Sequence, residues 1–241
     1  MHAPHQIFEP LFNKHRTTRG LECEFRLGKK NNKFFDTNVG DETFFAIKKA
    51  LEKYEGWEKV EAEEYEVYNA SGGRRTIYQD GDIKCSEIKT PLEKIDWISK
   101  DLPFDIRMSL ATEETVPEFG SEVEYERSCT KARTSFFRKG LRIDISIVTG
   151  SPDDHDAEED TSYQVEFEIL DPLKVKGATQ FYNHLYKIKD LLKCLPDIFS
   201  YSRNLSSMMR NFLRSLGSMR SLFILSNICL DWGQISKLLV V

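Results

Sequence analysis

Two segments far apart in the chain share a pattern that is typical of a β-strand with one charged and one apolar face. In residues 21–27 and in residues 163–169, apolar residues alternate strictly with polar or charged ones. Successive side chains of a strand point to opposite faces, so residues two apart project together. Each segment thereby gains a glutamate pair on one face: Glu22 and Glu24, then Glu166 and Glu168. The opposite faces carry core-forming residues: Cys23, Phe25, Leu27, Val165, Phe167 and Ile169.

If the two charged faces meet, four carboxylates converge. At a separation of about 5 Å and an effective dielectric of about 20, each pair of carboxylates repels by about 3 kcal/mol. A divalent cation relieves that repulsion, and Mg²⁺ and Mn²⁺ both prefer oxygen ligands. The pattern therefore predicts a Mn²⁺ or Mg²⁺ site formed by Glu22, Glu24, Glu166 and Glu168.

Glu-x-Glu alone is a weak pattern in a chain with so many charges. It recurs at residues 61–63, 64–66 and 122–126, where a solvated strand face is the simpler explanation. The two segments above differ from these because large apolar residues alternate cleanly around their glutamates. The metal-site hypothesis is therefore restricted to those two segments.

Composition and charge narrow the class of protein. The chain has 241 residues, 40% of them hydrophobic, which is enough for one substantial core. Its net charge of −5 argues against a protein that coats nucleic acid. Its five cysteines lack Cys-x-x-Cys spacing, which favours a reducing intracellular compartment over a zinc site or disulfide framework. No apolar run reaches membrane-spanning length, so we expect a soluble, unexported protein without a membrane partner.

The rest of the chain predicts about eight antiparallel strands with helices only at the margins. The further strand segments are 57–70, 74–78, 83–89, 104–110, 131–137 and 141–148. Helical spacing marks residues 44–54 and 181–192, and residues 1–20 are expected to be irregular or weakly helical. Basic residues gather on the middle strands and glutamates on the two flanking ones. We therefore predict a mainly β fold, a closed eight-stranded antiparallel β-barrel with a polar interior and peripheral helices.

The charge composition of the chain changes in its C-terminal part. From residue 201 on, five basic residues accompany a single acid, Asp231. Leu205, Met209, Phe212 and Leu216 are at helical spacing. We expect a catalytic domain over residues 1–200 and a basic, helical extension over residues 201–241. Whether that extension packs on the barrel, on another chain or on neither stays open.

Together these features resemble the triphosphate tunnel metalloenzymes. The glutamate segments, an arginine after the turn at residues 71–73, and the Lys-x-Arg pair at residues 131–133 carry the resemblance, which covers roughly residues 21–170. It is most similar to the metal-dependent RNA 5′-triphosphatases of fungi and large DNA viruses. The resemblance implies a barrel whose hydrophilic bore holds a triphosphate and a Mn²⁺ or Mg²⁺ ion.

The resemblance also implies roles for individual residues. The metal ligands are Glu22, Glu24, Glu166 and Glu168, whereas a third acidic position of the last strand falls on Gln164. The implied catalytic residues are Glu113, Arg75, Lys131, Arg133 and Asp144, the last paired with Ser146. The implied phosphate ligands are Arg75, Lys89, Arg107, Lys131 and Arg133. Three alternatives stay open, namely Arg74 for Arg75, Lys84 for Lys89 and Glu114 for Glu113.

The activity implied is removal of the γ-phosphate from the 5′-triphosphate end of nascent RNA, the first step of mRNA capping, with nucleoside triphosphates as side substrates. An mRNA guanylyltransferase partner and a homodimer are open, and the implied location is the nucleus, a cytoplasmic virus factory or the virion. One alternative is an inorganic tripolyphosphatase or thiamine triphosphatase on the same barrel. The small-substrate branch usually begins its glutamate strand nearer the N-terminus than residue 21. The other alternative is a non-catalytic barrel that binds polyphosphate or RNA ends.

Overall fold

The computed structural model describes residues 4–100, 102–120, 123–150 and 160–193. The helices in these ranges are α1 (Pro4–His15), α2 (Asp41–Glu52) and α3 (Ala178–Lys193), with short 3₁₀ turns η1 (Ser71–Gly73) and η2 (Pro172–Lys174). The strands are β1 (Leu21–Asn31), β2 (Phe34–Asp36), β3 (Lys59–Ala70), β4 (Arg74–Gln79), β5 (Asp82–Trp97), β6 (Asp105–Val116), β7 (Tyr125–Arg138), β8 (Leu141–Gly150) and β9 (Asp160–Ile169). Within these ranges no helix has the length and apolarity needed to cross a membrane.

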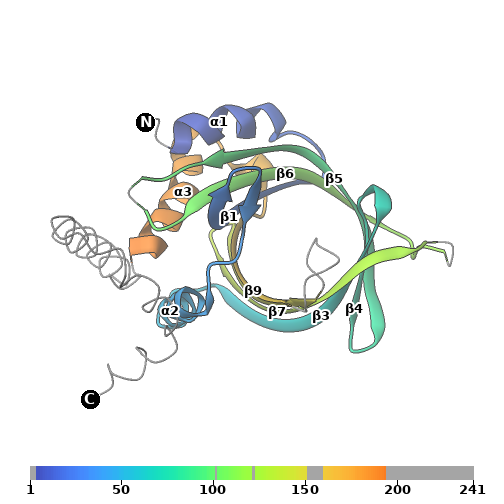
Figure 1. The fold of residues 1–241 in the computed structure, drawn as a ribbon. Coiled ribbons are helices and arrows are strands. Elements are labelled where there is room, and N and C mark those ends of the chain that lie inside the picture. Colours follow the sequence, from blue (N-terminus) through green and yellow to red (C-terminus); the bar gives the residue numbers. More distant parts are fainter. Residues whose placement is uncertain (1–3, 101, 121–122, 151–159, 194–241) are drawn as a thin grey trace, which may run out of the picture. The chain divides into compact units, whose positions relative to one another are not determined.

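The strands close into a ring (Figure 1). Their order is β2-β1-β6-β5-β4-β3-β7-β8-β9, and a further pairing between β1 and β9 completes the barrel. Every pairing is antiparallel, and β2 pairs only with the last residues of β1. The predicted closed eight-stranded barrel is confirmed, with β2 as an additional short strand.

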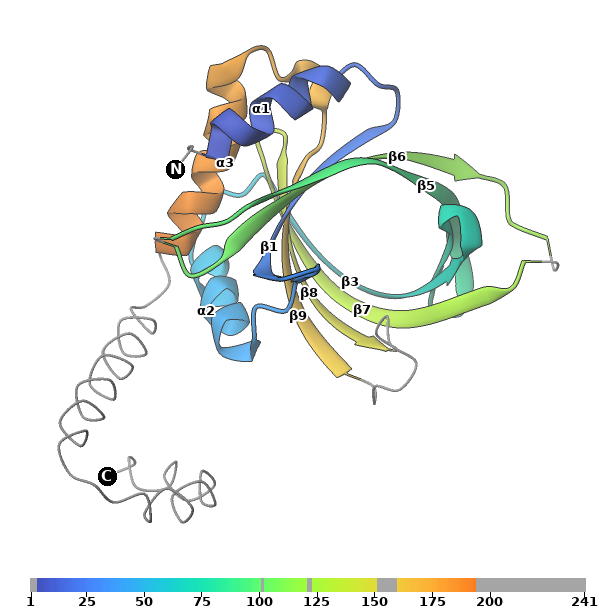
Figure 2. The same ribbon diagram turned by 45° about the horizontal axis from the view of Figure 1, so that its top comes forward.

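The hydrophobic core lies outside the barrel wall, not within it. The apolar faces of β1 and β9 are buried as predicted, with Phe25 and Phe167 each 1% exposed. Helices α1 and α3 lie side by side over the outer face of β1 (Figure 2). Phe12 of α1 stacks on Phe181 of α3 with ring centroids 4.6 Å apart, and Phe8 meets Phe25 edge-on at 5.6 Å. Because apolar burial happens on this outer face, the inner face is left for polar residues.

Several predicted elements differ from those observed. The N-terminal residues form a regular helix, α1, which the buried Phe8 and Phe12 anchor to the barrel. Strand β7 begins at Tyr125, six residues earlier than the predicted start, because those residues continue the pairing with β3. Strand β5 runs on to Trp97 through Pro91, which sits at a register shift where its missing N–H is tolerated. The predicted extension over residues 201–241 lies outside the described residues.

The turn between β3 and β4 depends on glycine. Gly73 has a φ of +74°, a left-handed conformation that side chains other than glycine rarely adopt. A Cβ at this position would lie 2.1 Å from the carbonyl oxygen of Lys89 on β5. The turn is therefore packed directly against a strand that contributes to the interior of the barrel.

Candidate active site

A cavity of about 220 Å³ lies inside the barrel, and all eight strands of the ring line it. Thirteen of its sixteen lining residues carry a charge, so the cavity suits a ligand with several charges of its own. The acidic residues are Glu22, Glu24, Glu87, Glu113, Asp144, Glu166 and Glu168. The basic residues are Arg26, Arg75, Lys89, Lys131, Arg133 and Arg142, and the uncharged ones are Tyr65, Val67 and Ile77.

Strand register brings three of the predicted metal ligands together. Glu24 on β1 lies directly opposite Glu168 on β9, and Glu22 projects from the same face of β1 two residues earlier. Directly opposed residues have Cβ atoms about 4.5–5.5 Å apart. Glu166 instead lies opposite Arg26, whose Nε is 2.9 Å from Glu166 Oε1. All four glutamates line the cavity, and Arg26 contacts two of them, since it also donates to both oxygens of Glu24. Glu22, Glu24 and Glu168 form a triangle, and Glu166 lies beside it.

Two carboxylates of this triangle, those of Glu22 and Glu168, are incompletely neutralised by their surroundings. Burial raises the pKa of Glu22 to about 7, against the opposing charge of Lys89 and with the support of Glu24. Burial likewise raises the pKa of Glu168 to about 7, although Arg142 opposes the shift. Both shifts mean that ionised carboxylates are costly at this place. A cation bound between them would lower that cost.

Four buried atoms of the cavity lining make no hydrogen bond within the described residues. Two are donors, Arg75 Nε and Arg133 Nε, and two are acceptors, Asp144 Oδ1 and Glu166 Oε1. The contact of Arg26 Nε with Glu166 Oε1 is close enough for an ion pair but lacks hydrogen-bond geometry. An unsatisfied buried polar atom costs about 1–3 kcal/mol. The two donors suit an anion such as a phosphate group, whereas Glu166 Oε1 already lies beside the Arg26 cation.

The acidic triangle fits a hard divalent ion by its chemistry. As the side chains stand, no three acidic, histidine or cysteine residues of the described part gather closely enough to hold a metal. The reason is that the carboxylates turn toward basic neighbours. Arg26 donates to both oxygens of Glu24, Lys89 contacts Glu22, and Arg142 bonds to Glu168. Small rotations of these three glutamates would present oxygen ligands to one ion, the donor set that Mg²⁺ and Mn²⁺ prefer.

The basic half of the cavity is organised around Asp144. This side chain is 3% exposed and accepts a hydrogen bond from Arg142 Nε at 2.9 Å. Nη1 of Arg133 lies 3.6 Å from the same carboxylate oxygen. Lys131 projects from the same face of β7 as Arg133, and burial lowers its pKa although the charge of Glu166 opposes that shift. Asp144 thus holds two arginines in place beside a buried lysine.

Glu113 lies on the side of the cavity formed by β4, β5 and β6. Its Oε1 accepts a hydrogen bond from Arg75 Nη2 at 2.6 Å, and Lys89 Nζ lies at 3.1 Å. Burial alone would raise the pKa of Glu113, but these two cations hold it below its usual value. Arg75 also contacts Glu87. Glu113 is therefore an ionised carboxylate inside the cavity, able to accept a proton or a hydrogen bond from water.

The structure distinguishes the neighbouring candidates that the sequence left open. The members of each pair that line the cavity are Arg75, Lys89 and Glu113. Arg74 donates its Nε to the carbonyl oxygen of Ser71 in the turn. Lys84 pairs with Glu63. Glu114 is exposed.

Arg107 and Gln164 lie outside the cavity lining. Arg107 donates to both oxygens of Asp96, at 2.6 and 2.9 Å, and its guanidinium lies 4.5 Å from the ring centre of Phe35. Its charge is thereby satisfied within the protein. Gln164 Nε2 donates to Ser162 Oγ at 3.4 Å. Neither arrangement supports a direct contact with substrate.

Some residues of the cavity received no role from sequence reasoning. Arg26 and Arg142 follow the same alternation as Glu24 and Asp144, so the period of two already placed them on the polar faces. Their importance lies in ion pairs across strands, such as that of Arg26 with Glu166. Those pairs depend on register between segments far apart in the chain, which alternation alone does not supply.

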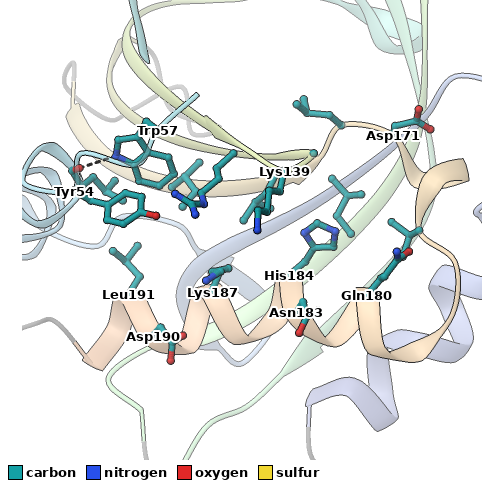
Figure 3. Close-up of a pocket in the computed structure, with 18 of the residues that line it drawn as sticks. Tyr54, Trp57, Lys139, Asp171, Gln180, Asn183, His184, Lys187, Asp190 and Leu191 are labelled. Atoms are coloured by element: carbon teal, nitrogen blue, oxygen red, sulfur yellow. Dashed lines mark hydrogen bonds between the residues drawn. The ribbon is translucent and has the colours of Figure 1, made fainter. Parts of the chain in front are cut away.

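A larger cavity of about 880 Å³ lies outside the barrel, between α2, the β7–β8 turn and α3 (Figure 3). In the figure His184, Lys187 and Leu191 of α3 point toward Trp57 and Lys139. Its walls are mostly apolar, and burial lowers the pKa of His184. It lacks the convergence of acidic and basic side chains that the barrel interior has. We therefore assign the chemistry to the interior.

Sequence comparison connects this interior to a known family. The family model for the mRNA capping enzyme, beta chain, matches residues 87–206. The chain belongs to the mRNA triphosphatase family. The region that matches the triphosphatase family includes Lys89, Glu113, Lys131, Arg133 and Asp144. The resemblance to the triphosphate tunnel enzymes is thereby confirmed.

Solved structures share the fold. The RNA triphosphatase Pct1 of S. pombe is 12% identical, with a TM-score of 0.65, and the alignment covers 81% of this chain and 95% of Pct1. The mimivirus capping enzyme triphosphatase is 14% identical, with a TM-score of 0.57 and coverage of 78% and 96%. A comparison with curated protein sequences finds no match. The shared fold thus extends over nearly the whole of both solved chains.

Proposed function

We propose that this chain is a metal-dependent RNA 5′-triphosphatase that removes the γ-phosphate of triphosphate-ended RNA in the first step of mRNA capping. The observation that carries the proposal is one cavity in which buried arginine donors without partners accompany carboxylates whose charge is incompletely neutralised. A triphosphate together with a divalent cation satisfies both sets. The products are inorganic phosphate and a diphosphate-ended RNA, ready for guanylyl transfer.

The proposed ligands of Mg²⁺ or Mn²⁺ are Glu22, Glu24 and Glu168. When bound, such an ion neutralises charge on the phosphate oxygens as the terminal bond breaks. Glu166 was expected to be a fourth ligand, but the cations around it favour a positioning role. The charges of Arg26, Lys131 and Arg133 lower its pKa in spite of burial, so it remains an anion that holds these cations.

The basic residues are proposed to hold the phosphate chain. Arg75 and Arg133 each offer a buried Nε without a partner, and an arginine fork can bind two phosphate oxygens at once. Lys131 and Lys89 add point charges. Glu113, bonded to Arg75, is the proposed group that orients the attacking water and accepts its proton, because its carboxylate stays ionised. This arrangement provides alignment and charge neutralisation, the two main requirements of phosphoryl transfer.

Partners and location follow from the same proposal. The S. pombe enzyme Pct1 has also been solved in complex with the Spt5 CTD. For this chain we propose the 5′-triphosphate end of nascent RNA as substrate, nucleoside triphosphates as side substrates, and an mRNA guanylyltransferase as the enzyme that acts next. We propose an intracellular site of action, in the nucleus or in a virus factory or virion, and a homodimer.

The alternatives on the same barrel are not favoured. The matching family model is that of an mRNA capping enzyme and not of a small-substrate tripolyphosphatase or thiamine triphosphatase. A non-catalytic binding barrel has no need for an ionised Glu113 beside two cations in the cavity. Both alternatives remain outcomes of the test below.

Phosphate release from triphosphate-ended RNA, ATP and inorganic tripolyphosphate tests the proposal. Each substrate is assayed with Mn²⁺, with Mg²⁺ and with a chelator. We expect release from RNA with either metal and none with the chelator. Release from tripolyphosphate alone would point to the small-substrate branch, and release from no substrate would leave a binding protein.

Variants connect the activity to the proposed site. Glu22→Ala and Glu168→Ala are expected to reduce release by at least about 100-fold, because each removes a metal ligand from the reaction centre. Glu64→Ala is the matched control, since Glu64 is an exposed glutamate in a Glu-x-Glu pair of β3. Wild-type activity in either cavity variant would contradict the metal assignment.

A further inference from the structure

One part of the tunnel wall carries no charge. Among the residues that line the cavity, only Tyr65 and Val67 on β3 and Ile77 on β4 are uncharged. Val67 lies directly opposite Ile77 in the register of the two strands and is 6% exposed. The two side chains therefore form one apolar surface within an otherwise charged cavity.

This surface continues onto the strands on both sides. Cys85 on β5 lies opposite Ile77, and Cys129 on β7 lies opposite Val67. Directly opposed residues project to the same side of a sheet, so both thiols face the tunnel. Burial raises the pKa of each thiol above its usual value, so both are neutral. Four neighbouring strands thus contribute an uncharged row: Cys85, Ile77, Val67 and Cys129.

The uncharged row faces the acidic strand across the tunnel. In the ring of eight strands β3 is the fourth strand from β1 in either direction, so it lies opposite β1. The side chain of Val67 therefore points across the bore toward β1, the strand that carries Glu22 and Glu24. The basic residues Arg75 and Lys131 flank the row, on the same faces of β4 and β7 as Ile77 and Cys129. A phosphate chain held by these groups runs beside an apolar surface.

Phosphate oxygens gain nothing from an apolar surface, whereas the ribose carbons and the base of a nucleotide do. We infer that Val67 and Ile77 form a seat for the sugar and base of the nucleotide that carries the triphosphate, and that Cys85 and Cys129 extend this seat. The inference rests on the proposed triphosphatase function and names the residues that would recognise the nucleoside of its substrate. Inorganic tripolyphosphate has no nucleoside to place there.

The seat makes a prediction that depends on the substrate. Ile77→Thr and Val67→Thr keep the β-branched shape and place a hydroxyl on the apolar surface. We expect kcat/KM for triphosphate-ended RNA and for ATP to fall roughly 10-fold, mostly through KM, which is the lower end of the effect of losing one apolar contact with a substrate. For tripolyphosphate we expect less than about a 2-fold change, because it has no group for the seat.

The matched control is Val148→Thr. Val148 lies on β8 opposite Lys131, so it projects to the same face of the barrel but is outside the cavity lining. It undergoes the same chemical change as Val67→Thr. We expect its kinetics to match the wild type with all three substrates. Thermal unfolding of all variants shows whether each is folded under the assay conditions.

Calorimetric titration with ATP and with tripolyphosphate separates this inference from the proposed activity. If the wild type hydrolyses none of the substrates but both seat variants bind ATP about 10-fold more weakly, the proposed activity fails and the seat stands. If the variants impair RNA, ATP and tripolyphosphate equally, the row only shapes the cavity and the inference is overturned. An ATP affinity unchanged in both variants overturns it as well.

Discussion

Glu166 and Glu168 lie two residues apart on the same face of β9 and have opposite electrostatic surroundings. Glu168 faces Glu24, and burial raises its pKa to about 7. Glu166 faces Arg26, and this and other nearby cations hold its pKa below the usual value in spite of burial. Each carboxylate has an arginine neighbour, Arg142 beside Glu168 and Arg26 beside Glu166, but only Glu166 is held as an anion by its cations. We therefore expect Glu168 to gain more from a bound metal ion than Glu166 does.

Calorimetric titration with Mn²⁺ tests this difference between the two glutamates. Glu168→Gln is expected to weaken Mn²⁺ binding by more than about 100-fold, beyond the 10–100-fold loss typical of a residue that only supports a ligand. Glu166→Gln is expected to stay within that 10–100-fold range or below it, because it acts on the ion through its neighbours. Equal losses in the two variants would mean that Glu166 is itself a ligand.

At the scale of elements, the helices and the outer face of the barrel depend on a small aromatic core. Phe12 of α1 is 1% exposed and stacks on Phe181 of α3. Phe12→Ala is expected to lower the free energy of unfolding by about 3–5 kcal/mol, the usual effect of removing a buried phenylalanine side chain. Phe34→Ala is the control, since Phe34 is 63% exposed and its loss should change stability by no more than about 0.5 kcal/mol. Urea unfolding measures both, and similar values would contradict the packing.

The turn between β3 and β4 gives a prediction that links backbone conformation to the site. Gly73 and Gly140 have nearly the same φ, +74° and +73°, but only at Gly73 would a Cβ meet the backbone of Lys89. Gly140→Ala should therefore lower the free energy of unfolding by only about 1–2 kcal/mol, which is the cost of a left-handed backbone conformation for alanine. Gly73→Ala should lower the free energy of unfolding by more than this. It should also reduce phosphate release, because β5 must shift to make room for the Cβ and Lys89 shifts with it. Denaturant unfolding and the release assay measure the two effects, and equal behaviour of the variants would refute the contact.

At the scale of the whole molecule, alternation predicted the barrel better than it predicted the lengths of the strands. The period of two is a local property, so the polar faces around Glu22 and Glu168 could be assigned from sequence. The early start of β7 at Tyr125 and the passage of β5 through Pro91 depend on pairing with other strands. Register has the same non-local origin, and it decides that Arg26 meets Glu166.

The charged interior makes the stability of the whole barrel depend on its ligand. Seven acidic and six basic residues line one small cavity, and some of their buried atoms lack partners. An ion that binds only the folded chain stabilises it, by about 2.7 kcal/mol at 100 times its dissociation constant.

For a chain of this length that stabilisation corresponds to a rise in Tm of roughly 5–10 °C. Thermal unfolding with and without Mn²⁺, and again after chelation, measures the rise without any assay of activity. Glu22→Gln should abolish the rise, whereas Glu64→Gln, on the exposed side of β3, should keep it. If Mn²⁺ does not raise the Tm of the wild type, or if the Glu22→Gln protein shows the full rise, these carboxylates do not bind the ion.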